Sequence, residues 1–371
     1  MKIALLSFHN AVNFGAALQA YALQYALEQK GHDCKYINYV NDSRRHKYSM
    51  SFLFWDSVRK RQISSALKYV IGAPFLLTRK RKFNKFYKEY LHTTEQEYCN
   101  SQEAASLNPM FDQFIVGSDQ VWNPYNNGND MAYLLDFVND SSKKISYASS
   151  FGLSELDDDL KERYRKCFLT FHALSVREKI GQKIVEDLTG KTPELVLDPV
   201  MLLTMQDWRT LASGVKGYKE KYIFTYTNRD QQINSFMKTG YHLGNKKIYK
   251  LSRFTKPKDF IDSSIRVKYW MSPLEFVDVI DNAELVVSAS FHCLAVAILL
   301  NKPFVAILEG VYGRDERLNN MLRMFHLEDR ALNDKMTEED VLKPIDWDFV
   351  NKEIIKRREE SLEYLHNAIG Y

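Results

Sequence analysis

The sequence predicts an α/β protein with two parallel-sheet domains, and three observations lead to this prediction. Short apolar strands alternate with helical segments along most of the 371 residues. The first unit has the order strand, glycine-containing loop, helix and strand, as in a Rossmann-like sheet. The same alternation starts again in the second half. With 45% hydrophobic and 26% charged residues, the chain is long enough to bury two such cores.

We expect the first Rossmann-like domain to cover residues 1–197. Its first helix, at 16–30, has apolar residues at helical spacing and ends at Gly31, a typical residue just past a helix end. The domain boundary is expected at Asp198-Pro199, because proline disfavours helix in the residue before it. The remaining expected elements are strands at 2–7, 34–40, 113–116, 144–148, 173–176 and 195–197 and helices at 156–170 and up to 188.

A second Rossmann-like domain is expected over residues 198–345. Ser272-Pro273 predicts a helix start, because proline suits the first helical position. A final helix at 347–367, within the segment 346–371, is expected to pack back onto the protein. Two such domains in series indicate a GT-B-like architecture with an interdomain cleft. The expected strands are 222–226, 247–251, 284–288 and 303–308, and the other expected helices are 230–243 and 291–300.

Residues 41–92 differ in composition from the rest of the first domain and predict a basic helical insertion. Between residues 44 and 88, thirteen Lys and Arg residues oppose a single acidic residue, Asp56, and aromatic residues lie among them. Such a segment can lie against anionic lipid headgroups. It can equally be a solvated pair of helices with an ordinary aromatic core, and the composition leaves both interpretations open.

Charge and cysteine content exclude several classes of protein. The net charge of +4 fits an anionic substrate or surface and does not predict nucleic-acid binding. Four isolated cysteines, without a CxxC pair or a histidine cluster, argue against a structural zinc site and suggest a reducing compartment. The N-terminal apolar run is too short for a signal peptide, and the run at 293–300 is too short to span a bilayer. We therefore expect a cytoplasmic protein.

Small polar residues follow several predicted strands, and in doubly wound domains these positions bind ligands. The motif GSDQVWNP, at 117–124, is the most unusual of them. Asp119 lies just beyond a buried strand, where a carboxylate needs a partner or a function. It is a candidate catalytic residue, or it caps the following turn.

The motif at Ser290-Phe291-His292 lies where a strand ends and a helix begins. The first N–H groups and the dipole of a helix favour an anion there. His292 can donate a hydrogen bond or move a proton, or it is a core histidine bonded to a carbonyl. Arg314 and Arg317, near the start of a later helix, hint at a bound anion, although solvated surface charge is the simpler interpretation.

Two further strand ends add candidates. Arg177 can bind a phosphate or carboxylate with its guanidinium, or it pairs with the adjacent Glu178. The turn Asn13-Phe14-Gly15 resembles a phosphate-approach loop. It lacks the glycines of a G-x-G-x-x-G motif, so a nicotinamide dinucleotide is poorly supported.

Together these motifs resemble the polysaccharide pyruvyl transferase family. The resemblance extends from near residue 1 to about residue 332. It rests on an ordered set of blocks: NFGAALQAYALQYAL, FIVGSDQVWNP, KISYASSFG, LSVREKIG, VLDPVMLL, SASFHCLAVAILLNKPFVAI and RDERLNNMLRMFHLEDR. This chain has Ser290 where some members have arginine, and Cys293 where a small residue is usual.

The resemblance implies a GT-B-like enzyme of surface polysaccharide biosynthesis that transfers pyruvate from phosphoenolpyruvate to a hexose as a cyclic ketal, with release of phosphate. We expect the hexose to be lipid-linked. It implies His292 and Asp119 as catalytic acid and base. Donor binding is assigned to Arg177 and to Ser290, Phe291 and His292 of the C-terminal domain. Acceptor binding is assigned to Asn13, Phe14, Gly15, Ser118 and Trp122 of the N-terminal domain. No metal and no cofactor beyond this co-substrate are expected, and a lipid-linked acceptor implies association with the inner face of the cell membrane.

Two alternatives stay open. A nucleotide-sugar glycosyltransferase with this architecture would use a carboxylate for the ribose, and Glu309 or Asp315 fits that position. A non-catalytic family member in a glycan assembly complex is the second alternative, suggested by Ser290 and Cys293. Phosphate release from phosphoenolpyruvate distinguishes the pyruvyl transferase from both.

Overall fold

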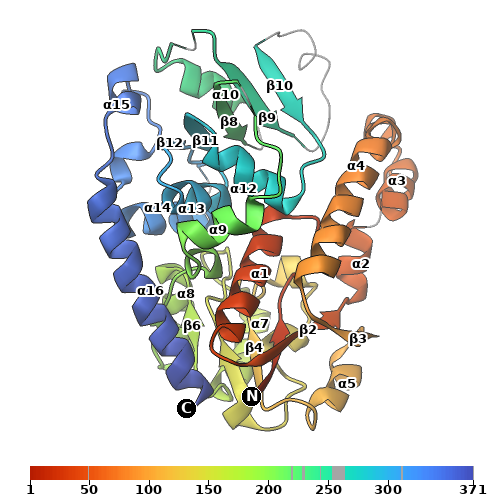
Figure 1. The fold of residues 1–371 in the computed structure, drawn as a ribbon. Helices are drawn as coiled ribbons and strands as arrows, with labels where there is room; N and C mark the ends of the chain where they lie inside the picture. Colours follow the sequence, from red (N-terminus) through yellow and green to blue (C-terminus); the bar gives the residue numbers. More distant parts are fainter. Residues whose placement is uncertain are drawn as a thin grey trace.

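The computed structural model describes residues 1–48, 50–218, 220–227, 230–242, 244–252, 264–310 and 312–370. It contains two five-stranded parallel sheets, one in each half of the chain (Figure 1). Helices cover both sheets, and the two units stack so that the carboxyl ends of their strands approach each other. The predicted α/β, GT-B-like fold is therefore confirmed.

The N-terminal sheet has the strand order β3-β2-β1-β4-β5. Its central strands are buried on both faces, as expected of a parallel sheet that helices cover. Two isolated bridges, Ile145 to Ala173 and Ser149 to Val176, continue this sheet toward the short pair β6 and β7. The strands are β1 Lys2–Leu6, β2 Asp33–Tyr39, β3 Thr93–Tyr98, β4 Gln113–Val116, β5 Lys144–Ser146, β6 Ser175–Val176 and β7 Glu194–Leu195. The helices outside the insertion are α1 Phe14–Glu28, α5 Ser101–Ala104, α6 Pro124–Asn127, α7 Asp158–Leu169 and α8 Lys179–Thr189.

The C-terminal sheet repeats this plan with the order β10-β9-β8-β11-β12. Its strands are β8 Tyr222–Tyr226, β9 Lys247–Leu251, β10 Ile265–Lys268, β11 Leu285–Ser288 and β12 Phe304–Ala306. The helices are α9 Met205–Ala212, α10 Asp230–Met237, α12 Pro273–Asp281, α13 Phe291–Leu299, α14 Tyr312–Met324, α15 Glu338–Leu342 and α16 Trp347–Ile369. Of these, α16 runs along one side of both units and ends near the N-terminus of the chain (Figure 1).

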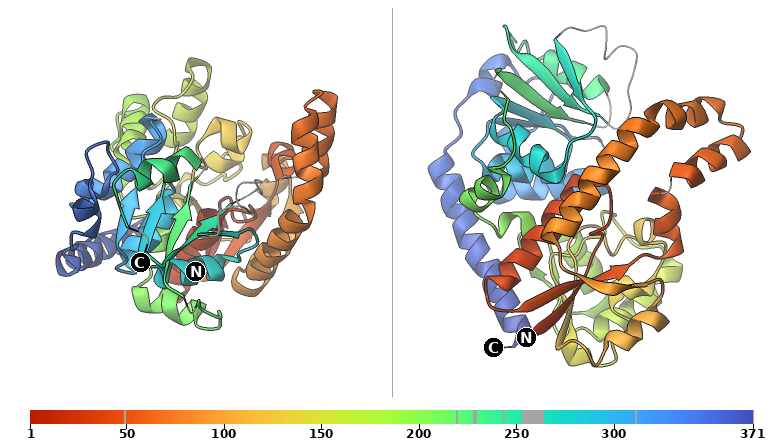
Figure 2. Two further views of the ribbon diagram at one scale, coloured as in Figure 1. Left: turned by 90° about the horizontal axis from the view of Figure 1, so that it is seen from above. Right: turned by 45° about the vertical axis from the view of Figure 1, so that its right-hand side comes forward.

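Three helices occupy the basic segment: α2 Asp42–Tyr48, α3 Met50–Arg59 and α4 Ile63–Tyr90. Helices α3 and α4 pack against each other and project from the body of the protein (Figure 2). We call residues 50–90 the α3–α4 hairpin. The C-terminal half of α4 contacts both units: Phe83 packs against Phe14 of α1, with ring centroids 5.0 Å apart, and Lys82 Nζ lies 2.7 Å from Glu275 Oε1 on α12.

The interface between the two units has an apolar core. The ring of Phe14, at the start of α1, stacks on Phe276 of α12 with ring centroids 4.4 Å apart. The guanidinium of Arg79 lies over the Phe14 ring, 4.6 Å from its centroid. Phe14 and Phe276 are both fully buried, so they hold the first turn of α1 against the C-terminal unit.

Three differences from the sequence-based expectations concern individual elements. Strands β3 and β10 were not expected, because their polar residues at 93–98 and 265–268 hide the strand pattern. Helix α10 ends at Met237, whereas a helix to residue 243 was expected, and residue 243 lies outside the described residues. The boundary at residues 197/198 stays a prediction. It falls between β7 and β8.

Candidate functional site

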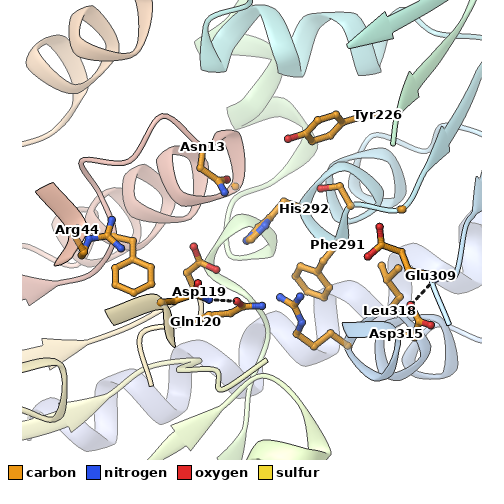
Figure 3. Close-up of a pocket in the computed structure, with 16 residues that line it drawn as sticks. Asn13, Arg44, Asp119, Gln120, Tyr226, Phe291, His292, Glu309, Asp315 and Leu318 are labelled. Carbon is orange, nitrogen blue, oxygen red and sulfur yellow. Dashed lines mark hydrogen bonds between the residues drawn. The ribbon is translucent and has the colours of Figure 1, made fainter. Parts of the chain in front are cut away.

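A cavity of about 410 Å³ lies between the two units, at the carboxyl ends of their strands. Its lining comes from both halves of the chain, as expected for a ligand site in this architecture. Figure 3 shows the Asp119 carboxylate and the His292 ring facing the same central space, with Arg44 on the N-terminal side and Glu309 on the C-terminal side. The lining residues that the sequence predicted are Asn13, Gly15, Asp119, Ser290, Phe291 and His292.

Two helices begin at this cavity, one from each unit. Asn13 caps α1, since its side-chain oxygen accepts a hydrogen bond from Ala16 N at 3.2 Å. Ser290 caps α13 by accepting from Cys293 N at 3.5 Å. Uncapped N–H groups in a first helical turn favour an anion. Both helix starts therefore give the cavity positive potential.

Gly15 allows the two helix starts to meet. A β-carbon on Gly15 would lie 2.0 Å from Nδ1 of His292 and 2.4 Å from its Cγ, closer than any real contact. The imidazole of the C-terminal unit thus fills the space that a side chain would take on α1. This contact requires glycine at position 15 for steric reasons, although its φ is an ordinary helical one.

Beside the cavity lies a buried ionic cluster centred on Arg177. Its Nη1 donates to Asp198 Oδ2 at 2.6 Å, and its Nη2 and Nε lie 3.5 Å from Asp119 Oδ1 and Glu178 Oε2. His292 Nε2 is 3.4 Å from both Arg177 Nη1 and Asp198 Oδ2. The cluster therefore joins the loops after β4, β6 and β7 to the first turn of α13.

The charges in this cluster stabilise one another. Burial opposes ionisation of Asp198, but His292, Arg177 and the Val200 N–H together hold the pKa of its carboxyl well below the usual range. Burial likewise opposes the charge on Arg177, yet Asp198, Glu178 and Asp119 raise the pKa of the guanidinium on balance. Ionised forms of Asp198 and Arg177 are therefore expected throughout the physiological pH range.

Asp119 is held at the end of β4 by an unusual backbone. Its φ is +70°, in the left-handed region that aspartate tolerates better than most residues. Its side chain is 15% exposed, on the cavity side of the Arg177 cluster. This carboxylate can therefore reach a ligand. The next helix, α6, is capped by Asn123, whose side chain accepts a hydrogen bond from Tyr125 N at 3.0 Å, and no described contact supports the alternative that Asp119 is a cap.

Four predicted site residues do not line the cavity. The side chain of Arg177 is 1% exposed and is occupied by the carboxylates around it, so it lies behind His292 instead of in contact with the cavity. Phe14 is fully buried in the interface core. Ser118 is also buried, and Ala148 O and Asp198 Oδ2 both lie within hydrogen-bond distance of its single hydroxyl proton, at 3.0 and 3.2 Å from Oγ. Trp122 packs among aromatic rings and donates from Nε1 to Tyr133 O, so its role is structural.

The cavity also includes residues that the sequence did not assign to the site. Arg44 of α2 lines the N-terminal wall, with its guanidinium 3.7 Å from the centre of the Phe8 ring. Arg317 of α14, where the sequence only hinted at a bound anion and favoured solvated surface charge, lines the opposite wall. If the amide oxygen of Gln120 faces Arg317, it accepts two hydrogen bonds at 2.8 and 3.0 Å. Gln120 lies in the loop after the predicted strand 113–116, and Tyr226 is the last residue of the predicted strand 222–226, so their places at strand ends could have identified them. Nothing local marked Arg44 within a basic segment.

Two other candidates are resolved by their contacts. Asp315 accepts hydrogen bonds from the backbone N–H groups of Glu309 and Gly310 at 2.8 and 2.7 Å, so it organises the loop after β12. The side chain of Arg314 lies outside what the structure describes.

Cys293 faces the hydrophobic core, where burial raises the pKa of its thiol to about 12. Among the described residues, no group of three or more His, Cys, Asp or Glu side chains is arranged to hold a metal ion.

Comparisons with known proteins agree with the architecture. The family model "Polysaccharide pyruvyl transferase" matches residues 13–309. A search of curated proteins finds no match.

Solved structures with a similar fold have low sequence identity to the chain. Arabidopsis thaliana UGT89C1, complexed with UDP-L-rhamnose, is 7% identical with a TM-score of 0.53, over 100% of this chain and 99% of that one. AviGT4, a glycosyltransferase of avilamycin A biosynthesis, is 10% identical with a TM-score of 0.52, over 100% and 99%. A Listeria monocytogenes protein assigned as a UDP-N-acetylglucosamine 2-epimerase is 9% identical with a TM-score of 0.53, over 98% and 90%. At these identities the likeness concerns the fold alone.

Proposed function

Because the chain belongs to the polysaccharide pyruvyl transferase family, we propose that it transfers pyruvate from phosphoenolpyruvate to a hexose in surface polysaccharide biosynthesis. One observation supports this most strongly. The interdomain cavity combines an imidazole, a carboxylate and two helix starts, the groups that such a transfer needs. A cavity of about 410 Å³ falls within the roughly 300–1,000 Å³ typical of small-molecule sites.

The reaction requires one proton acceptor and one proton donor. A sugar hydroxyl loses its proton and attacks C2 of the donor, while the methylene carbon gains a proton and becomes a methyl group. The bond from C2 to the phosphate oxygen breaks as a second hydroxyl closes the ketal, and the second hydroxyl proton leaves with phosphate. We assign His292 as the acid and phosphate ligand and Asp119 as the base, each contributing on the order of 10²–10⁴-fold.

Donor binding needs positive charge inside the cavity. The start of α13, at Ser290, Phe291 and His292, is the proposed donor side, together with Arg317 on the same wall. Arg177 is better assigned to orienting these groups, because three carboxylates already surround it. Asn13 and Gly15 at the start of α1 belong to the proposed acceptor side, and Arg44 extends that side toward the hairpin.

The test is incubation with phosphoenolpyruvate and a panel of free and lipid-linked hexosides, with phosphate release and mass spectrometry as readouts. His292→Ala should abolish turnover. His172→Ala, an exposed histidine outside the cavity, is the matched control and should retain it. The same hexosides are also incubated with UDP-sugars as donors. Sugar transfer from a UDP-sugar, with no consumption of phosphoenolpyruvate, would support the nucleotide-sugar alternative. Donor binding without any transfer would support the non-catalytic one.

A lipid-linked acceptor would bring the protein to a membrane surface, and the α3–α4 hairpin is the proposed contact. It presents exposed apolar residues, of which Trp55 is the most prominent at 63% exposure. Exposed cations lie at its tip: Arg59, Lys60 and Arg61. Exposed aromatic and basic residues on one protruding element suit an anionic bilayer surface. Among the described residues, no helix is long and apolar enough to cross a bilayer.

Vesicle binding tests this contact. Charge reversal at Arg59, Lys60 and Arg61 should weaken binding to anionic vesicles, and binding should fall as salt is added. Arg79 and Lys82 are less suitable for this experiment, because Arg79 is buried over Phe14 and Lys82 pairs with Glu275. Reversal at exposed lysines elsewhere provides the control: Lys335, Lys352 and Lys356. Equal binding by both triple variants and the unmodified protein would exclude the hairpin as the membrane contact.

A further inference from the structure

We propose that Asp198 is a positioning residue for His292: its carboxylate fixes the imidazole in one orientation with a proton on Nε2. The role of that orientation in catalysis rests on the proposed function. Asp198 is itself buried and does not line the cavity, so it would act through His292 and not on the substrate.

The Asp198 carboxylate is held rigidly from both of its oxygens. Oδ1 accepts a hydrogen bond from Val200 N at 3.1 Å, which caps the short helix η4, Pro199–Met201. Oδ2 accepts from Arg177 Nη1 at 2.6 Å and from the Ser118 hydroxyl at 3.2 Å, and it lies 3.4 Å from His292 Nε2. A carboxylate fixed in this way can define the angle of an imidazole that contacts it.

The position of the proton on His292 follows from charge. Nε2 lies 3.4 Å from Arg177 Nη1, which can only donate, and 3.4 Å from Asp198 Oδ2, which accepts. Asp119, Glu178 and Asp198 supply three negative charges around the single positive charge of Arg177. The excess of two negative charges favours a proton on Nε2, donated to Asp198.

This arrangement aligns the site across the two units. Asp198 follows β7 of the N-terminal unit, whereas His292 lies in the first turn of α13 beside the C-terminal sheet. The opposite ring nitrogen, Nδ1, lies on the side of Gly15, which also lines the cavity. Contacts on two sides of the ring therefore leave the imidazole little freedom to rotate.

The test compares Asp198→Asn with Asp140→Asn, a matched control. Asp140 also caps a short helix, η3 Ser141–Lys143, by accepting from the N–H two residues on, but it lies outside the cavity. The first readout is the long-range ¹H–¹⁵N NMR spectrum of the histidine rings. The signals of His292 are identified because they disappear in His292→Ala. The second is kcat and KM for phosphoenolpyruvate, with kcat expected to fall roughly 10²-fold through misalignment and KM to change far less.

In the unmodified protein we expect the spectrum to show a proton on Nε2 of His292, altered in Asp198→Asn and retained in Asp140→Asn. An unprotonated Nε2 in the unmodified protein would overturn the proposal. This measurement needs no variant, so the test still works if Asp198→Asn does not fold. An unchanged His292 signal in a folded Asp198→Asn would overturn it as well. If the spectra respond as expected but phosphoenolpyruvate is never consumed, the positioning role stands and the proposed function fails.

Discussion

Replacing Gly15 with alanine tests whether the two units meet as the structure places them. The added β-carbon would lie 2.0 Å from His292 Nδ1, whereas ordinary contacts begin at about 3.4 Å. Either the imidazole or the start of α1 must therefore move by more than 1 Å, an estimate obtained from these two distances. A displacement of about 1 Å at a catalytic group can reduce turnover on the order of 10²-fold.

The effect on stability combines two opposing terms. Alanine favours a helix over glycine by roughly 0.5–1 kcal/mol, which would stabilise α1. Overpacking costs typically about 1–3 kcal/mol. We expect a net loss of about 1–2 kcal/mol in the free energy of unfolding, measured by urea denaturation.

Two further variants identify the cause. Gly181→Ala is the matched control, because Gly181 lies in α8 and its β-carbon would meet neighbours only at 3.5 Å or more. It should retain activity and should gain up to roughly 0.5–1 kcal/mol in the free energy of unfolding, since only the helix-propensity effect applies there. In His292→Ala the ring is absent, so adding Gly15→Ala should cost nothing more, and the double-mutant cycle should give a coupling energy of about 0.5–3 kcal/mol.

The cycle does not depend on finding the substrate. If Gly15→Ala has normal stability and no coupling to His292→Ala, then His292 does not occupy the space beside Gly15, and the arrangement of the cavity described above is wrong.

Three other predictions concern buried groups. Burial lowers the pKa of His9 to about 4, so between pH 6.5 and 4 the unfolded chain binds a proton that the folded protein does not. The free energy of unfolding should therefore fall by about 3 kcal/mol as pH drops from 6.5 toward 4. His9→Asn should flatten this pH dependence of stability in denaturation curves. Arg177→Met should cost about 3–5 kcal/mol, because three carboxylates lose their counter-ion, and the loss measured at pH 8 should exceed that at pH 5. A thiol-reactive reagent at pH 8 should label Cys99 before Cys34 and Cys293, as followed by mass spectrometry. The reason is that burial raises the pKa of the Cys34 and Cys293 thiols to about 12. Faster labelling of Cys293 than of Cys99 would mean that α13 opens readily.

Much of the fold could be predicted because its strands are buried and its helix ends have typical residues. The apolar runs that became β1, β4, β8 and β11 are short and bounded by small polar residues, which distinguishes them from helices. Strands β3 and β10 lie at sheet edges, where polar side chains face water and remove that pattern.

The site was harder to predict, since its residues meet only after folding. Position after a strand marked Asp119 and His292, which line the same cavity, but it could not separate residues facing the cavity from those facing the core. Ser118 and Asp119 are adjacent, yet one is fully buried and the other is partly exposed. The partners of Arg177 include Asp198, which the sequence offered only as a domain boundary. Long-range charge pairs of this kind leave no local pattern.

Helix α16 has a consequence for how the two units can move. Near its start, the Phe349 ring contacts His326 of the C-terminal unit at 5.2 Å between centroids. Farther along, Tyr364 donates to Ser146 O at 2.9 Å, and Ser361 accepts from Leu197 N at 3.0 Å. Because this one helix contacts both units, it should act as a hinge between them. Opening should then be greatest at the opposite edge, on the side of α4 (Figure 1), where the Lys82–Glu275 pair has side chains 32% exposed. That pair, worth about 1 kcal/mol or less, would then be the first contact to part when substrates enter.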